Sequence, residues 1–331
     1  VVRRFMFVLG PLSSVFDFMV FGLLLHVFHA DEALFHTSWF VESLATQVLV
    51  IFIIRSKHPF RNRPHPLLVA SSLSAIAVAV GLPYSPAAPW LGFVPVPAPL
   101  SALDPNAKTA VLIGCEHARK KTLGGIDTIR ATSSLVGKKV CHADVCCGAP
   151  LLYAGDKARF HEQSRKFAES MRGKDQLIVG DAGCASTIRM HYTDKLPIPV
   201  LHFSELAARE VMQLKRVEVA GSVRWHDPCQ LGRGLGVYDA PRQILSRVLG
   251  RAPEEFARNR EDARCSGAGG LLPVTMPDVA RGIAEQRVAD HDREGGGTIV
   301  TACASSARAL SRAGTSQVLD LATVVVRALE S

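Results

Sequence analysis

Cysteine carries the strongest chemical signal in this sequence of 331 residues. All eight cysteines lie beyond residue 100, and seven of them form two similar series. Each series has one cysteine, then a Cys-Cys or Cys-Ser pair followed by glycine, then a cysteine 37 positions after the second member of the pair. The first series is Cys115, Cys146, Cys147 and Cys184, and the second is Cys229, Cys265, Ser266 and Cys303. These matching intervals indicate an internal duplication.

The chemistry open to the two series depends on whether their thiols converge. Three or four thiolates from separate loops can hold an iron–sulfur cluster or a zinc ion. A single cysteine is more often a small buried hydrophobe, and we interpret Cys141 in that way because it has no counterpart in the second series. Disulfides fit less well, since the cysteines are spread along a whole domain and not concentrated in a small scaffold. We therefore favour ligand roles for the other seven.

Short β-branched segments precede several of these cysteines and alternate with amphipathic segments. Strands are expected at 110–115, 139–147, 176–184, 223–229 and 298–303, and helices at 159–172, 204–214, 241–249 and 278–294. This alternation predicts an α/β fold with mainly parallel strands. In such sheets ligands gather where strands lead into helices, and the helix N-termini there favour thiolates.

Four motifs carry a family resemblance in this region: CCGAP (146–150), WHDPCQLGRGLGVYDAPRQIL (225–245), CSGAGGLLPVTMP (265–277) and TACASS (301–306). Residues 108–330 resemble the cysteine-rich CCG-domain family, which includes the B subunit of heterodisulfide reductase and the glycolate oxidase iron–sulfur subunit, with the domain duplicated. In that family each full repeat supplies cysteine ligands to a [4Fe–4S] cluster. The resemblance implies an oxidoreductase subunit that transfers electrons between a flavin-dependent dehydrogenase, or another redox subunit, and an acceptor.

The sequence departs from the family pattern at three positions. The family ends each repeat with CxxC, and here Asp181 and Val300 occupy the first position of that motif. Ser266 replaces the second cysteine of the second pair. The resemblance thus implies a [4Fe–4S] cluster on the four cysteines of the first series and a weaker site on the three of the second. For the weaker site a further ligand such as His226 or Ser266, a zinc ion, and a structural copy without metal remain open.

The first hundred residues have a different composition. Apolar stretches at 5–28, at 39–54 and from residue 67 onward predict an all-α membrane segment of about three helices. We expect it to contact lipid through residues 5–90. The basic loop 55–63 belongs on the cytoplasmic side, because Lys and Arg are retained there. The predicted localisation is the inner, or cytoplasmic, membrane.

Residues 3–97 resemble the last membrane helices of magnesium-importing P-type ATPases. The sequence has no DKTGT phosphorylation motif and no nucleotide-binding domain, so the resemblance implies an inactive transporter remnant. Three spans would leave residue 100 outside the cytoplasm, whereas a CCG domain is expected to work in the reducing cytoplasm. This disagreement favours a join of unrelated gene pieces, and the start at Val1 favours a fragment or an unusual start codon.

These observations divide the chain into four segments: an ATPase-like membrane segment (1–97), a Pro-rich linker (98–107), a first CCG repeat (108–218) and a second (219–331). The 48% hydrophobic content and the net charge of +8 therefore average two unlike parts. Basic residues beyond position 100 are spread and not clustered, which argues against nucleic-acid binding. Two alternatives to a redox subunit remain: a fragment of a magnesium or other cation-transporting P-type ATPase, and a zinc-binding structural CCG domain.

Overall fold

The computed structural model describes residues 17–22, 38–44, 46, 48, 65–82, 102–120, 122–219 and 221–330. The chain divides into two units, Val1–Pro99 and Leu100–Ser331. In the first unit, helix α3 (Pro66–Gly81) starts with proline at its first position, and the His65 ring accepts a hydrogen bond from the Leu67 backbone N at 3.3 Å. Both features favour a helix start.

The predicted membrane segment is described only in part. Helix α3 has 16 residues, whereas a bilayer crossing takes roughly 20. Within the described ranges, no helix combines the length and the apolar character that a membrane crossing requires. Most of the first two predicted spans, at 5–28 and 39–54, lies outside the described residues.

The second unit contains two parallel four-stranded sheets with the same strand order. The first sheet has the order β2-β1-β3-β4, with β1 Thr109–Leu112, β2 Cys141–His142, β3 Gln176–Val179 and β4 Val200–His202. The second has the order β6-β5-β7-β8, with β5 Val223–Trp225, β6 Glu254–Glu255, β7 Thr298–Thr301 and β8 Val318–Asp320. All strand pairs are parallel. The predicted duplicated α/β fold is therefore confirmed.

Helices connect the strands in both halves, as parallel pairing requires. The first half contains α4 Cys115–Lys120, α5 Leu123–Val136, α6 Ala149–Tyr153, α7 Lys157–Ser170, α8 Ala182–Ser186, a π-helical turn at Thr187–His191, α9 Phe203–Arg209 and a 3₁₀ turn at Val211–Gln213. The second contains α10 Gly232–Leu235, α11 Asp239–Leu249, a 3₁₀ turn at Arg260–Asp262, α12 Leu272–Thr275, α13 Pro277–Arg293, α14 Ala304–Ala313 and α15 Leu321–Glu330.

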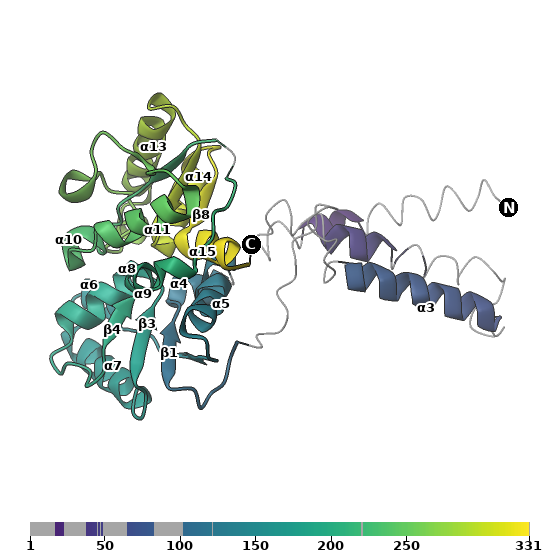
Figure 1. Cartoon of the computed structure of the whole chain (residues 1–331), viewed down its shortest axis with the longest axis horizontal. Coiled ribbons are helices and arrows are strands. Elements are labelled where there is room, and N and C mark those ends of the chain that lie inside the picture. The colour runs from purple at the N-terminus through teal and green to yellow at the C-terminus, as the bar shows by residue number, and fades with distance from the viewer. Residues whose placement is uncertain are drawn as a thin grey trace. The chain divides into compact units, whose positions relative to one another are not determined.

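One hydrophobic core joins the two halves. Helix α5 packs on α15, and α9 packs on α11 (Figure 1). The shared core includes Val111 and Phe203 from the first half and Trp225, Leu245 and Val325 from the second, all buried. Each fully buried large apolar side chain contributes about 1.5–3 kcal/mol relative to an exposed one. This packing holds the two sheets together as a single unit.

Candidate functional site

The cysteines of the first series follow three neighbouring strands. Cys115 begins α4 after β1, the pair Cys146–Cys147 follows β2, and Cys184 lies in α8 after β3. Because the strands are parallel, their carboxyl ends meet at one edge of the sheet. Gly114 has φ 89°, and a Cβ there would lie only 2.8 Å from the Cβ of Asp181, the N-cap residue of α8. The glycine thus lets β1 end close against α8.

The four thiols of the first series form a continuous chain of contacts. Side-chain interactions link Cys146 to both Cys115 and Cys147. The Cys147 Sγ lies 3.2 Å from the Cys184 Sγ, and the Gly148 backbone N donates to the Cys146 Sγ at 3.4 Å. Cys147 and Cys184 are buried, whereas Cys115 and Cys146 are exposed. The structure therefore brings together all four predicted residues of this series.

Interactions among the first-series thiols shift their pKa values in opposite directions. The bonds from Cys115 and Cys147 hold the pKa of Cys146 far below its usual range. The pKa values of Cys115 and Cys147 are raised, chiefly by their side-chain interaction with Cys146 and in addition by desolvation. Cys146 thus carries a negative charge more readily than Cys115 or Cys147, as a ligand thiolate must.

Two side chains that the sequence did not single out hold the backbone of the cysteine pair. The Tyr192 hydroxyl donates to the Cys147 carbonyl at 3.0 Å, and the Gln163 Nε2 donates to the Cys146 carbonyl at 2.8 Å. Tyr192 is buried between the rings of Phe160 and Phe167. Desolvation raises the pKa of Tyr192, so its hydroxyl keeps the proton that it donates.

The second series converges in a similar way with one thiol fewer. The Cys229 thiol donates to Cys265, and that bond lowers the pKa of Cys265 to about 6. The Gly267 backbone N also donates to the Cys265 Sγ, at 3.3 Å. Cys303 interacts electrostatically with Cys229, and desolvation raises its pKa to about 12. In place of the second cysteine of the pair, Ser266 forms a hydrogen bond with Ser306 at 2.8 Å between hydroxyl oxygens.

His226, the candidate extra ligand, and Cys141, the cysteine without a ligand role, make their contacts elsewhere. His226 is buried, its Nδ1 accepts from the Arg287 Nε at 3.3 Å, and its ring packs edge-on against Phe256. Desolvation lowers the pKa of His226 to about 3, so the ring is neutral. Cys141 lies in β2, where its thiol donates to the His142 carbonyl at 3.7 Å. The described contacts of both side chains are thus with other groups than the series cysteines.

A buried ion-pair network supports the turn before Cys229. Arg242 makes two hydrogen bonds to the Asp227 carboxylate, both at 2.8 Å, and two to Glu255, at 2.7 and 2.8 Å. Asp227 also accepts from the Trp225 Nε1 at 2.8 Å. Hydrogen bonds from Arg242 outweigh desolvation and lower the pKa of Asp227. The WHDPC motif therefore anchors the Cys229 turn to α11.

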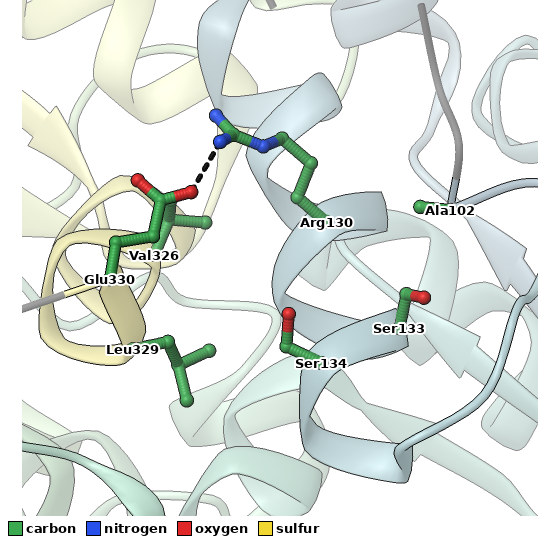
Figure 2. Close-up of a pocket in the computed structure, with 7 residues that line it drawn as sticks. All are labelled: Ala102, Arg130, Ser133, Ser134, Val326, Leu329 and Glu330. Carbon is green, nitrogen blue, oxygen red and sulfur yellow. Dashed lines mark hydrogen bonds and ion pairs between the residues drawn. The ribbon is translucent and has the colours of Figure 1, made fainter. Parts of the chain in front are cut away.

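The donor set suits an iron–sulfur cluster, since it consists of thiols on separate loops with backbone N–H groups directed at sulfur. This fit rests on the chemistry of the donors and not on a preformed ligand geometry, because across the described ranges no three His, Cys, Asp or Glu side chains are already arranged to hold a metal ion. A pocket lined by Ala102, Arg130, Ser133, Ser134, Val326, Leu329 and Glu330 lies elsewhere, between α5 and α15 (Figure 2). An ion pair between Arg130 and Glu330 crosses it. It contains none of the cysteines.

The duplicated parallel sheets and their paired cysteine loops define a cysteine-rich α/β domain. The family described as "Cysteine-rich domain" (CCG) matches residues 109–189 and 223–310, just over half of the chain, and the chain belongs to this family. A second family, "Cation transporting ATPase, C-terminus", matches residues 1–103. Both resemblances seen in the sequence are thereby confirmed.

Relatives of known function match the two parts separately. The D subunit of dihydromethanophenazine:CoB–CoM heterodisulfide reductase from Methanosarcina mazei is 31% identical over 202 residues, covering 57% of this chain and 49% of that protein. The B subunit of fumarate reductase (CoM/CoB) from Methanothermobacter marburgensis is 29% identical over 160 residues, covering 48% and 32%. Magnesium-transporting ATPase, P-type 1, of Salmonella typhimurium is 40% identical over 100 residues, covering 28% and 11%. The chain thus spans half or less of the length of these relatives.

Proposed function

We propose that the second unit is an iron–sulfur redox subunit that transfers electrons between a partner dehydrogenase and an acceptor. The observation that carries this proposal is the grouping of the four first-series cysteines at one sheet edge, where the Cys147 and Cys184 Sγ atoms lie 3.2 Å apart. The family membership and the relatives named as heterodisulfide and fumarate reductase subunits support it. The partner that we propose is a flavin-dependent dehydrogenase or another redox subunit.

In this proposal Cys115, Cys146, Cys147 and Cys184 hold one [4Fe–4S] cluster, which supplies one-electron chemistry when bound. The chain's own groups hold the thiolates in place. Gly148 directs its backbone N–H at the Cys146 sulfur, and such hydrogen bonds stabilise negative charge on sulfur. The aromatic cluster around Tyr192 excludes water from the inner side of the cysteine pair.

Cys229, Cys265 and Cys303 form a second, weaker site in the same proposal. This set has three thiols, and Ser266 is hydrogen-bonded to Ser306. His226 remains a candidate fourth ligand only if it rotates away from Arg287, to which it is now bonded. A zinc ion is the alternative occupant, because three or four sulfur and nitrogen ligands suit it.

A reduction experiment tests the redox function. The full chain, purified without oxygen, is expected to absorb broadly in the visible region, to bleach when dithionite is added, and to yield a cluster EPR signal. The Cys146→Ser variant is expected to lose both signals, whereas Cys141→Ser keeps them. A folded chain that takes up no electrons from dithionite would overturn the proposal.

We also propose that residues 1–97 are a transporter remnant that anchors the chain to the inner membrane, with the second unit in the cytoplasm. The match of residues 1–103 to the C-terminal part of cation-transporting ATPases supports this. The full chain is then expected to stay in the membrane fraction after an alkaline carbonate wash. Recovery of the full chain in the soluble fraction would contradict the anchor.

A further inference from the structure

Six exposed cations precede strands of the second unit, whereas the cysteines of both series follow strands. These cations come before β2, β5 and β6: Lys138, Lys139, Lys215, Arg216, Arg247 and Arg251. The strands within each sheet are parallel, so the cations lie toward the amino-terminal edges of the sheets and the cysteines toward the carboxyl-terminal edges. The cations are therefore separate from both proposed cluster sites.

Hydrogen bonds join the segments that carry these cations, although the segments are far apart in the sequence. The Gln213 Nε2 donates to the Leu135 carbonyl at 3.2 Å, which links the end of α5 to the segment before β5. The Arg247 Nε donates to the Leu214 carbonyl at 2.9 Å, which links that segment to the end of α11. The cations thus form one surface, which we call the basic band: Lys138, Lys139, Lys215, Arg216, Arg247 and Arg251.

The basic band has little negative charge to balance it. Across the described ranges, none of its six cations forms an ion pair with a carboxylate. Arg247 and Arg251 donate hydrogen bonds to uncharged backbone carbonyls. The segments that carry the band contain two acids, Glu210 and Glu218, against six cations. An anionic surface would therefore meet exposed positive charge that is not already neutralised.

An apolar side chain projects from the same surface. Met212 lies in the 3₁₀ turn Val211–Gln213, next to the residue that bonds to α5, and it is 77% exposed. A single exposed apolar side chain needs no explanation by itself. Among Lys and Arg, however, it matches the composition of surfaces that lie at the boundary between lipid headgroups and acyl chains.

The chain enters the second unit beside the basic band. The Val140 backbone N donates to the Ala102 carbonyl at 2.8 Å, and the Asp104 backbone N donates to the Val140 carbonyl at 2.9 Å. Val140 directly follows Lys139. The anchor proposed above ends at residue 97, and five residues of fully extended chain span at most about 18 Å. An anchored chain therefore keeps this end of the band close to lipid.

We propose that the basic band binds the anionic headgroups of the membrane that holds the chain. The inference draws on the proposed anchor and is independent of the redox function. Anionic lipids attract Lys and Arg within about one Debye length, roughly 10 Å, of the membrane surface. Binding through the band turns the cysteine edges of both sheets away from lipid, where a partner subunit can reach them.

Lysine acetylation of the full chain tests this surface residue by residue. The chain is bound to vesicles of phosphatidylcholine alone or of an equal mixture of phosphatidylcholine and phosphatidylglycerol, and acetylated lysines are quantified by peptide mass spectrometry. Lys138, Lys139 and Lys215 are expected to react at least about threefold more slowly on the anionic vesicles, because headgroups cover their amines. Lys157, exposed at the start of α7, should react equally on both. Equal rates for the band lysines on the two vesicles would overturn the proposal.

Two charge-matched variants locate the contact. Lys138→Gln/Lys139→Gln removes two cations of the band and keeps Lys215 as the reporter, whose protection by anionic vesicles is expected to fall by at least half. Lys157→Gln/Lys166→Gln removes two exposed cations of α7, so the protection of Lys215 should equal that of the wild type. Circular dichroism verifies that both variants fold. Full protection of Lys215 in the folded band variant contradicts the proposal.

The two vesicles also separate this proposal from the anchor. Cosedimentation with phosphatidylcholine vesicles tests the anchor alone, because these vesicles carry no net charge. A chain that sediments only with the anionic vesicles, with its band lysines protected, supports the band even though the anchor fails. Salt at about 1 M shortens the Debye length to about 3 Å and should remove the protection. Duplex DNA that protects the band lysines better than anionic vesicles at equal phosphate concentration would overturn the assignment to lipid.

Discussion

The Asp181 carboxylate accepts a hydrogen bond from the Ala304 backbone N at 3.1 Å, across 123 positions of sequence. Its other oxygen accepts from the Gly183 and Cys184 backbone N atoms at 2.9 and 3.2 Å. One buried side chain therefore caps α8 of the first half and α14 of the second. Because Cys303 immediately precedes Ala304, this single carboxylate positions a cysteine of each series.

Replacing Asp181 by alanine is expected to destabilise the second unit strongly. Three backbone N–H groups lose their acceptor, and unsatisfied buried donors cost about 1–3 kcal/mol each, so a loss of at least about 3 kcal/mol is expected. Urea unfolding followed by circular dichroism measures it. Asp156→Ala is the control, since it removes one N-cap bond of α7 near the surface and should cost about 1 kcal/mol. Equal losses in the two variants would contradict the capping role.

Gly267 and Gly137 can be compared directly, since both have positive φ values, 74° and 65°. A Cβ on Gly267 would lie 2.2 Å from the Ala280 carbonyl oxygen, whereas one on Gly137 meets nothing within 4 Å. Gly137→Ala should therefore cost only the backbone strain of about 1–2 kcal/mol. Gly267→Ala should cost about 1–3 kcal/mol more, because the Cys265 turn must move off α13. Thermal unfolding of both variants tests the difference, and similar midpoints would show that the turn is not tightly packed.

Asp127 should make stability fall as pH rises. Burial raises its pKa to about 6, above the ordinary value of 3.8, so the folded state holds the proton more tightly than the unfolded chain. Stability is then lost between about pH 4 and pH 6, by about 3 kcal/mol when Asp127 is fully ionised. Asp127→Asn removes this loss because asparagine stays neutral. Free energies of unfolding measured from pH 4 to pH 8 should therefore separate in favour of the variant up to about pH 6 and stay apart above it, and a difference that is already constant between pH 4 and pH 6 would contradict the assigned pKa.

The alternation of strands and helices and the cysteine spacing predicted the duplicated parallel fold, because strand-to-helix connections are local in sequence. The predicted strand 139–147 proved shorter, with only Cys141–His142 paired to β1. There the chain turns away, so that Cys146 interacts with Cys115 and Cys147 contacts Cys184. The early end of this strand depends on contacts between loops that are distant in sequence, and the local pattern of residue types does not reveal such contacts.

The roles of Asp181 and Ser266 also required the structure. The sequence showed where cysteines of the family pattern are missing, but not what the substitutes do. The Asp181 carboxylate accepts a hydrogen bond from the Ala304 backbone N of the second half, and the Ser266 hydroxyl is hydrogen-bonded to the Ser306 hydroxyl. Tyr192 and Gln163 lacked any signal, since each reaches the cysteine pair through its backbone carbonyls.

Iron and acid-labile sulfide content per chain tests the central claim most directly. The wild-type chain, purified without oxygen, is expected to contain about four of each per occupied [4Fe–4S] site. Cys146→Ser should lose the cluster of the first series, whereas Cys141→Ser should retain the wild-type content. A folded wild-type chain with stoichiometric zinc and no iron or labile sulfide would contradict the claim.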